Sequence, residues 1–460
     1  YRYGSQIHLL LGLIQVILEE GLEDGEFLAA RTEGLGGVRQ AARAYNPVQV
    51  AELTGVPEET LREAARAFAQ AQDGVTLFGR EALALDDGRA LRQALANLLL
   101  LTGHVGRANN GLIALLPHNN SRGAADMGLV PYRLPGYAPL DDARARARLE
   151  AMWASPPPDD KWSRLSGPGL GAHKMLGGGV KALYVMGADP AAQRPQGLEF
   201  LVVQDLFLTE TARLADVVLP AASFAEREGT FTNTERRVQR FKQAIRSPGE
   251  ARADWWIVAE IAKRIKGTQG GWGYASPGQI MDEITRAVPI YGGMSYEGLG
   301  AVGRRSALRE VYEGMSFENV AGEGCQWPAA AEDPTTRFTL HWLEPQAPHE
   351  ADESFPFTLV APRLLFDAGT LIARSQILRP LIPQAQVALN ATDARRLGIA
   401  DGDGVQVTSA RGSLELTARL DGQVPQGVVL VPQNLGGAAI NQLLGPGVIA
   451  AQVRIAKVEG

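Results

Sequence analysis

Apolar residues along the first hundred positions recur at the three- and four-residue spacing of amphipathic helices. The pattern predicts helices at Ile7 to Leu18, Glu58 to Gln72 and Leu91 to Leu101, with a short strand at Val75 to Phe78. Pro57 stands just before the second helix, where a helix start tolerates proline, and Thr102-Gly103 ends the third, as expected for a glycine cap. The first part of the chain is therefore predicted to be mainly helical.

The pattern changes at Val180 to short apolar strands that alternate with helical or turn segments. The predicted strands are Lys181 to Met186, Phe200 to Val203 and Asp216 to Leu219, and helices are predicted at Thr209 to Leu214 and Asp254 to Ile265. Such alternation is typical of a parallel sheet covered by helices. Ligands of such sheets bind beyond the carboxyl ends of the strands. We therefore expect a ligand crevice near Gly187 to Pro190 and Asp205.

The last hundred residues contain short apolar runs separated by turns. Strands are predicted at Phe357 to Val360, Val387 to Leu389, Val405 to Ser409, Leu414 to Leu420, Val428 to Val431 and Val453 to Ile455. Ala410-Arg411-Gly412 predicts a hairpin between two of these strands, and only one short helix, Thr392 to Leu397, interrupts them. This pattern indicates a small β-barrel.

These patterns indicate an α/β protein with four parts. Residues 1–155 form a helical and α/β region, and residues 156–266 form a parallel α/β domain. Residues 267–355 form a linker rich in Gly and Pro with a few short elements, and residues 356–460 form a C-terminal β-barrel. The length of 460 residues is sufficient for about three domains of ordinary size.

The composition excludes several kinds of site. Hydrophobic residues make up 45% and charged residues 21%, as in soluble globular proteins, and the net charge of −6 provides no basic face for nucleic acid. An iron–sulfur cluster needs about four thiolates, and a structural zinc site needs several Cys or His ligands. The one cysteine, Cys325, is therefore interpreted as an incidental thiol, and no metal site is expected. No two of the six histidines have the i, i+4 spacing that holds a metal on a helix.

The apolar segment at residues 7–18 is not predicted to cross a membrane or to be a signal peptide. It is shorter than the roughly 20 apolar residues that a spanning helix needs, and it contains His8 and Gln15. No basic region with a following small-residue cleavage site accompanies it. Because the chain begins at Tyr1, almost inside this predicted helix, we expect that the domain starts upstream.

Short sequence motifs identify no catalytic or phosphate-binding loop. The runs Gly36-Gly37 and Gly177 to Gly179 form neither a Gly-x-Gly-x-x-Gly nor a Walker A pattern, and no Gly-x-Ser-x-Gly elbow is present. The densest polar stretch is Glu226 to Gln239, and a second polar loop contains Asn119, Asn120 and Asp126. Each stretch is either a ligand-binding loop or a capped turn, and the residues alone leave both interpretations open.

Several of these segments resemble signatures of the molybdopterin oxidoreductase superfamily. They are Asn119-Asn120 with Gly123 to Gly128, Leu183 to Pro190, Ala215 to Ser223, Glu228 to Gln239, Leu389-Asn390, Asp393-Ala394, Leu397 to Ile399 and Gly402-Asp403. The matches follow the order of the family over nearly the whole chain. The resemblance implies molybdopterin-oxidoreductase-like parallel α/β domains followed by a small C-terminal β-barrel of the double-psi type.

Two members of the superfamily fit these segments: the large iron–sulfur subunit of respiratory complex I, and the catalytic subunit of a formate dehydrogenase or similar molybdenum enzyme. Active enzymes that resemble this chain carry a His-containing motif where it has Leu365 to Thr370, and a Gly where it has Pro362. Where those enzymes have a polar, aromatic stretch, this chain has Gln433 to Ala438, with small and apolar residues. A cofactor with pyrophosphate groups needs polar partners to replace water. These departures favour the complex I subunit.

The resemblance to complex I implies a structural, redox-inactive part of that subunit, with no catalytic residue, metal or cofactor in this chain. The 2Fe-2S and 4Fe-4S clusters that relay electrons from NADH and flavin toward quinone would lie in the upstream part of the subunit. A molybdenum-pterin is implied only under the formate dehydrogenase alternative. The candidate residues of a relic pterin pocket are Gly187, Asp189, Asp205, Glu228, Thr230, Asn233 and Asn390.

The same resemblance implies partners and a location. The partners would be other peripheral-arm subunits of complex I, with no nucleic acid. The location would be the cytoplasmic face of the inner membrane, peripheral and without a membrane span. A third interpretation, from a different class, is a free-standing module that binds a small molecule in the strand-end crevice. That module would be a soluble monomer without partner subunits.

Overall fold

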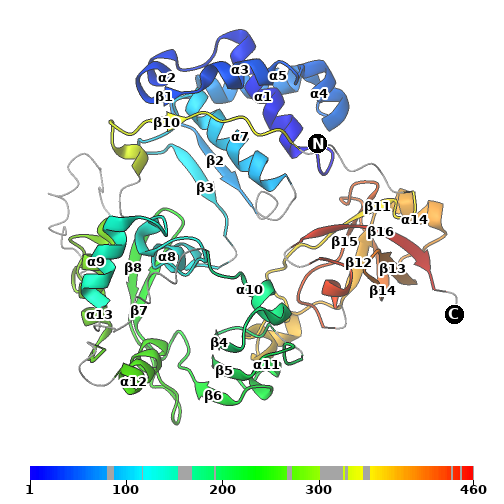
Figure 1. Ribbon diagram of the computed structural model, residues 1–460. Coiled ribbons are helices and arrows are strands. Elements are labelled where there is room, and N and C mark those ends of the chain that lie inside the picture. Colours follow the sequence, from blue (N-terminus) through cyan, green and yellow to red (C-terminus); the bar gives the residue numbers. More distant parts are fainter. Residues whose placement is uncertain are drawn as a thin grey trace. The chain divides into compact units, whose positions relative to one another are not determined.

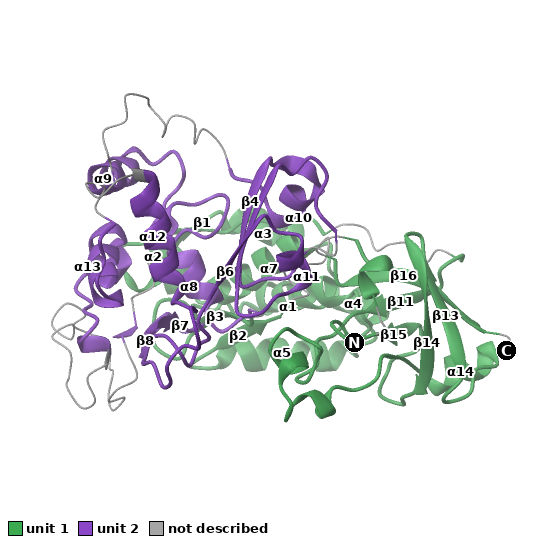
Figure 2. Cartoon of the chain, turned by 90° about the horizontal axis from the view of Figure 1, so that it is seen from below, with its two compact units in different colours: residues 1–115, 330–460 green, residues 116–329 purple. Residues whose placement is uncertain are grey.

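The computed structural model describes residues 1–79, 87–116, 118–153, 168–190, 193–266, 272–300, 325–326, 330–345, 353–436, 439–445 and 448–458. The chain divides into two compact units (Figure 2). Unit 1 contains residues 1–115 and 330–460, and unit 2 contains residues 116–329. The division into four parts at residues 155, 266 and 355 stays a prediction.

A helical layer forms the N-terminal part of unit 1 (Figure 1). Its helices are α1 (Gln6–Glu20), α2 (Gly25–Arg31), α3 (Leu35–Ala42), α4 (Pro47–Thr54), α5 (Glu58–Gln70) and α7 (Gly88–Leu101). α1 packs against α3, α4, α5 and α7 and buries Leu11, Ile14 and Ile17. The three helices predicted in this part of the chain are confirmed, because their apolar positions share this core.

Short parallel strand pairs accompany these helices. β2 (Val75–Phe78), a predicted strand, pairs with β3 (Gly111–Ala114). β1 (Thr32–Glu33) pairs with β10 (Phe338–Thr339), which returns from late in the chain. Leu340, just after β10, is buried in the same core as α1 and α7. Residues after 330 therefore complete the core of the helical layer.

A closed β-barrel forms the C-terminal part of unit 1 (Figure 1). Its strands are β11 (Phe357–Val360), β12 (Gln386–Leu389), β13 (Gly404–Ser409), β14 (Gly412–Leu420), β15 (Val428–Leu430) and β16 (Ala450–Lys457), in the order β11-β15-β12-β14-β13-β16. All six predicted strands are confirmed, as are the hairpin between β13 and β14 and the helix α14 (Ala391–Leu397). Along β13 the buried Val405 and Val407 alternate with the exposed Gln406, which is the pattern of a sheet with one apolar face.

The described residues of unit 2 contain two sheets. Three parallel strands, β4 (Ala182–Met186), β5 (Phe200–Asp205) and β6 (Val217–Pro220), form the predicted parallel sheet, with β5 in the centre. Leu201 and Val203 of β5 are fully buried against Ala212 of the short helix α11 (Glu210–Arg213). The second sheet is antiparallel and consists of β7 (Gly229–Thr232), β8 (Arg237–Phe241) and β9 (Cys325–Gln326). The α/β fold class with a C-terminal barrel is thus confirmed.

The remaining helices of unit 2 are α8 (Ser121–Asp126), α9 (Ala143–Trp153), α10 (Ala172–Lys174), α12 (Asp254–Lys266) and α13 (Pro277–Ala287). α12 was predicted, whereas α13 lies in the segment expected to be a linker with a few short elements. Ser276 caps α13 and Pro277 occupies its first turn, and both are helix-start signals that the irregular sequence pattern obscured. Much of the predicted linker lies outside the described residues.

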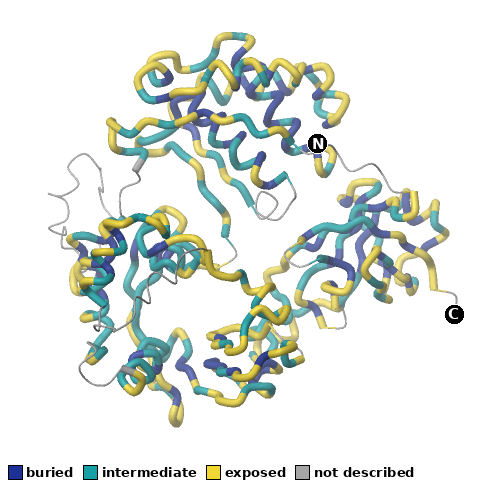
Figure 3. The backbone as a smooth tube through the Cα atoms, viewed as in Figure 1, coloured by how far each residue is buried: buried dark blue, intermediate teal, exposed yellow. Residues whose placement is uncertain are grey.

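The most apolar helix, α1, is a core helix. Figure 3 shows buried positions along α1, along α7 and in the barrel strands. Within the described ranges, no helix is long and apolar enough to span a lipid bilayer.

Candidate functional site

Gly187, at the end of β4, lies at the carboxyl edge of the parallel sheet, where a ligand crevice was expected. Its N–H donates to the carbonyl oxygen of Gln204 on β5 at 2.9 Å. Its φ of +60° lies in the left-handed region, and no atom is within 4 Å of the position that a Cβ would occupy. The chain therefore turns sharply here and leaves space beside the strand end.

Asp189 follows this turn and binds the start of α11. Its Oδ1 accepts hydrogen bonds from the N–H and the hydroxyl of Thr211, both at 2.8 Å. Burial opposes ionisation of this carboxyl, but the hydrogen bonds from Thr211 outweigh burial and lower the pKa of Asp189. Asp189 thus joins the end of β4 to α11.

Asp205 ends the central strand of the same sheet and is only 5% exposed. Its Oδ1 accepts a bond from the Phe207 N–H at 3.2 Å, and its carbonyl accepts one from the Ala221 N–H at 3.0 Å. Gly187, Asp189 and Asp205 are therefore brought to one edge of the sheet. This polar edge is the first candidate region for a ligand.

A polar network that the sequence did not reveal supports this edge. Gln204 is completely buried, and its Nε2 donates to Oδ1 of Asp254 at 2.7 Å. Its Oε1 accepts a hydrogen bond from the hydroxyl of Tyr184 on β4. Arg227 forms an ion pair with the same Asp254, which begins α12. Gln204, the residue before Asp205, is therefore fixed by a hydrogen bond to Tyr184 on β4 and by another to Asp254 on α12.

Glu228, Thr230 and Asn233 lie on the antiparallel sheet. The carboxylate of Glu228 pairs with Arg240 at 3.1 Å, and Thr230 is opposite Arg240 in the strand register. The guanidinium of Arg240 lies 4.0 Å from the ring centre of Tyr296. Oδ1 of Asn233 accepts bonds from the N–H groups of residues 235 and 237, both at 2.9 Å, and so closes the β7–β8 turn. For Asn233 the geometry is that of a capped turn.

Asn390, the seventh candidate, lies in the barrel of unit 1. Its Oδ1 caps α14 by accepting a bond from the Thr392 N–H at 2.8 Å, and its Nδ2 donates to the carbonyl of Val424 at 2.8 Å. The side-chain oxygen and nitrogen of Asn390 thus join the start of α14 to the chain at Val424.

A buried polar cluster surrounds Asp126 of α8. The hydroxyl of Tyr137 donates to Oδ1 of Asp126 at 2.5 Å, and the hydroxyl of Tyr291 donates to Oδ2 at 2.8 Å. The oxygen of Tyr291 also lies 2.8 Å from the hydroxyl of Thr232 on β7. The Thr232 N–H donates to Oδ1 of Asn120 at 2.9 Å. Asp126, Thr232 and Asn120 were noted in the sequence, but no local signal links them to Tyr137 or Tyr291.

The two tyrosines in this cluster act as hydrogen-bond donors. Burial raises the pKa of Tyr291 strongly, and the neighbouring Asp126 adds to the effect. Burial and the bond to Asp126 raise the pKa of Tyr137 to about 12. Both phenols therefore keep their protons at neutral pH.

Two barrel segments that the sequence marks as poor in polar groups meet through a polar pair. Nδ2 of Asn434 donates to Oδ2 of Asp367 at 3.1 Å, and Oδ1 of Asp367 accepts a bond from the Gly369 N–H at 2.8 Å. Asn434 has φ of +56°, a left-handed conformation that Asn tolerates better than most residues. The pair joins the two segments to each other, and the expectation that they have lost polar anchors for a cofactor stays a prediction.

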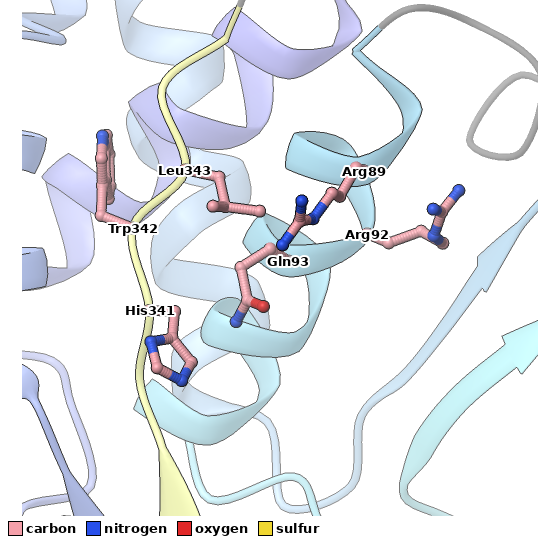
Figure 4. A pocket seen from close by; sticks show the side chains of 6 residues that line it. All are labelled: Arg89, Arg92, Gln93, His341, Trp342 and Leu343. Carbon is pink, nitrogen blue, oxygen red and sulfur yellow. The ribbon is translucent and has the colours of Figure 1, made fainter. Parts of the chain in front are cut away.

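A groove of about 370 Å³ lies in unit 1 between α7 and the extended chain after β10. Arg89, Arg92 and Gln93 line it from α7, and residues 341–343 line it from the extended chain (Figure 4). Nδ2 of Asn97 donates to the carbonyl of His341 at 2.7 Å and fixes the two sides together. Two guanidinium groups, those of Arg89 and Arg92, therefore belong to the lining of the groove.

The single cysteine and the acidic side chains form no metal site in the part of the chain that the structure describes. Cys325 is half-buried in β9, and burial raises its pKa to about 11, so the thiol is protonated at neutral pH. Among the described residues, no three His, Cys, Asp or Glu side chains are grouped as metal ligands.

Two family models match most of the chain. Residues 2–264 match the model described as "Molybdopterin oxidoreductase", and residues 357–452 match the model described as "Molydopterin dinucleotide binding domain". The first match includes the polar edge. It also includes Asn120, Asp126, Tyr137 and Thr232 of the Asp126 cluster, whereas Tyr291 lies beyond its end. The second includes strands β11 to β15 of the barrel and the first residues of β16.

Similar proteins include two formate dehydrogenases. The alpha subunit of F420-dependent formate dehydrogenase 2 from Methanococcus maripaludis is 35% identical over 96% of this chain and 65% of its own length. Formate dehydrogenase H from Escherichia coli is 31% identical over 96% of this chain and 62% of its own length. The chain thus spans less than two thirds of these relatives. Acetylene hydratase from Pelobacter acetylenicus has a similar fold, with a TM-score of 0.66 at 18% identity over 99% of this chain and 71% of the hydratase.

Proposed function

Because the chain belongs to the molybdopterin oxidoreductase family, we propose that it is the cofactor-binding part of a formate dehydrogenase-like catalytic subunit. The proposed cofactor is a molybdenum-pterin dinucleotide, and the proposed substrate is formate. The similarity to formate dehydrogenase subunits at 35% and 31% identity supports this choice of substrate. Since those relatives are longer, the activity is proposed for the subunit as a whole.

The polar edge at Gly187 and Asp205 is the observation that carries this proposal. It lies at the carboxyl ends of parallel strands, where nucleotides bind to open α/β sheets. Gly187 leaves space for a ligand next to the backbone. The nearly buried carboxyl of Asp205 accepts one backbone bond through Oδ1, and a carboxylate has further acceptor sites for ribose hydroxyls or purine N–H groups. The residues present therefore fit the nucleotide part of the proposed cofactor.

The bound cofactor would supply two-electron redox chemistry at its metal. The residues of this chain would hold and orient it. Asp205 would accept hydrogen bonds from the nucleotide.

The prediction that the chain belongs to the complex I subunit is wrong. The reported relatives are formate dehydrogenase subunits, and the matched models are those of molybdopterin proteins. The choice of complex I depended on the expected loss of polar groups from separate segments. The relatives and the family models overturn that choice, whereas the loss of polar groups stays a prediction. The formate dehydrogenase alternative is the better supported one.

The predictions that followed from complex I are corrected with it. The expectation of no cofactor in this chain is wrong, because both matched models are defined by molybdopterin. The proposed partners are now other subunits of a formate dehydrogenase instead of peripheral-arm subunits of complex I. The assignment as an NADH dehydrogenase is wrong for the same reason. The peripheral location on the cytoplasmic face of the inner membrane, and the seven pocket residues, stay predictions.

Metal and pterin analysis of the native purified protein tests the proposal. We expect molybdenum or tungsten and a fluorescent oxidised pterin in constant ratio to the polypeptide, with formate-dependent reduction of a dye. Pterin without formate-dependent reduction would keep the cofactor and refute the substrate. Absence of both metal and pterin would refute the proposed function.

A further inference from the structure

We propose that Asp126 is a positioning residue, which acts through Tyr291 and Thr232 to hold the side-chain amide of Asn120 for the bound cofactor. Asp126 does not lie at the polar edge, and no step of the proposed function uses it. The inference rests on the proposed pterin cofactor, and it adds a new group of residues that prepares the chain to bind it.

The hydrogen bonds in the cluster have a fixed direction. A tyrosine hydroxyl has one proton, and that of Tyr291 is donated to Oδ2 of Asp126 at 2.8 Å. The Thr232 hydroxyl, 2.8 Å away, must therefore donate to the oxygen of Tyr291. The backbone N–H of Thr232 then donates to Oδ1 of Asn120. A continuous series of bonds thus connects Asp126 with Asn120 through β7.

Burial makes this series cooperative. Asp126 is 0% exposed, Thr232 is 2% exposed and Tyr291 is 3% exposed. A buried polar group that loses its partner gains no water in exchange, so the loss of one bond destabilises the neighbouring bonds too. The arrangement holds Asn120 in one orientation more firmly than a surface turn would.

Gly123 provides an independent indication that this orientation is required. A Cβ at residue 123 would lie 2.3 Å from Oδ1 of Asn120 and 3.2 Å from the hydroxyl of Thr232. Gly123 is inside α8 and is absent from the positive-φ residues, so its backbone does not call for glycine. The side chain of Asn120 therefore crosses α8 to β7 only because residue 123 has no side chain.

The fixed orientation leaves the amide nitrogen of Asn120 for a ligand. Its Oδ1 is engaged by Thr232, and no hydrogen bond from its Nδ2 is present within the described residues. The preceding residues, His118 and Asn119, are exposed. The amide N–H groups match the ring carbonyl and ring nitrogen acceptors of a pterin, so we assign Asn120 as the residue that the network positions.

The test compares two tyrosine-to-phenylalanine variants in the native protein, purified together with its partner subunits. Tyr291→Phe removes the central donor of the network. Tyr274→Phe is the matched control, because the Tyr274 hydroxyl donates to the carboxylate of Glu283 at 2.7 Å in the same unit but outside the network. We expect pterin retained after gel filtration to fall about tenfold in Tyr291→Phe, as for loss of a hydrogen bond to a charged group, and to stay unchanged in the control.

A third variant separates positioning from folding. Asn120→Asp keeps an oxygen for the Thr232 N–H but removes the amide donors. We expect wild-type thermal stability with reduced pterin retention, a combination that a merely structural role would not produce. If Tyr291→Phe does not fold, the thermal stability and pterin retention of Asn120→Asp test the inference on their own.

Four outcomes would overturn the inference. Retention of pterin in Asn120→Asp, or retention in Tyr291→Phe, would show that the network does not serve the cofactor. Equal loss in Tyr291→Phe and Tyr274→Phe would show that only general stability matters. A wild-type protein without pterin would refute both this inference and the proposed function. Metal and pterin analysis of the unmodified protein therefore distinguishes failure of the inference alone from failure of both.

Discussion

The barrel and the Asp126 cluster are built in different ways. The barrel core consists of apolar side chains from six strands within one hundred residues, with Val405, Val407 and Leu389 fully buried. The cluster consists of polar side chains from α8, β7 and a turn near residue 291, and its key bond joins residues 165 positions apart. Apolar burial is non-directional, whereas a hydrogen bond requires correct distance and angle.

The barrel core and the Asp126 cluster should therefore respond differently to substitutions. An apolar core loses stability in proportion to the volume removed, and other side chains partly fill the space. A polar cluster instead loses function when one group shifts by a fraction of an ångström, even where the fold survives.

Leu389→Ala in the barrel should have the largest effect on stability. Leu389 is 0% exposed in β12, and removal of such a side chain costs about 2–5 kcal/mol. Urea unfolding measures this loss. Gln406→Ala, at an exposed position of β13, should change stability by less than about 0.5 kcal/mol. Equal effects of the two variants would contradict the barrel core described above.

Gly123→Ala should destabilise unit 2 by about 1–3 kcal/mol, because the added methyl group overlaps with Oδ1 of Asn120. Gly36→Ala is the matched control. Gly36 is also inside a helix, α3, and has no atom within 4 Å of its Cβ position, so alanine there should be neutral or stabilising. Thermal unfolding compares the two variants, and a stabilising Gly123→Ala would exclude the close contact.

Asp189→Asn should lower stability by about 1 kcal/mol at pH 7, the usual contribution of a hydrogen bond. Since the pKa of Asp189 is lowered on folding, its contribution is present above the unfolded pKa of about 4 and is lost as the pH falls through the folded pKa. The difference from wild type should therefore shrink on acidification below about pH 4. Unfolding curves at several pH values measure it, with the exposed Glu199→Gln as a control. A constant difference would contradict the hydrogen bonds to Thr211.

Lys457→Ala in the barrel should have the smallest effect. Lys457 pairs with Asp403 at 2.6 Å, but half of its side chain is exposed, and such pairs contribute about 0–1 kcal/mol. The effect should decrease further in high salt. A loss above about 2 kcal/mol in urea unfolding would show that surface polar pairs of the barrel resemble the buried cluster.

Much of the fold could be predicted because its elements have local signals. The barrel strands alternate buried and exposed residues, and α1, α5 and α7 have helical apolar spacing, so each element is specified by neighbours in the sequence. α13 was missed because its start signals, Ser276 and Pro277, stand in a region rich in Gly and Pro, where they resemble a turn.

Less of the candidate site could be predicted. Gly187 and Asp205 were expected at the strand ends, because parallel strands place their carboxyl ends at one edge. Tyr291 and Asp367 gave no such signal. Each acquires its role from a partner that is distant in the sequence, Asp126 in one case and Asn434 in the other.

The sequence by itself determined the α/β class, the barrel, the parallel sheet and the resemblance to the molybdopterin oxidoreductases, because these follow from apolar periodicity and from contiguous motifs. The tertiary structure decided which polar residues act together: the Asp126 cluster, the bond of Gln204 to Asp254 and the Asp367–Asn434 pair. The physical reason is that apolar patterns are periodic along the chain, whereas a hydrogen bond depends on atoms that only the folded chain brings within about 3 Å.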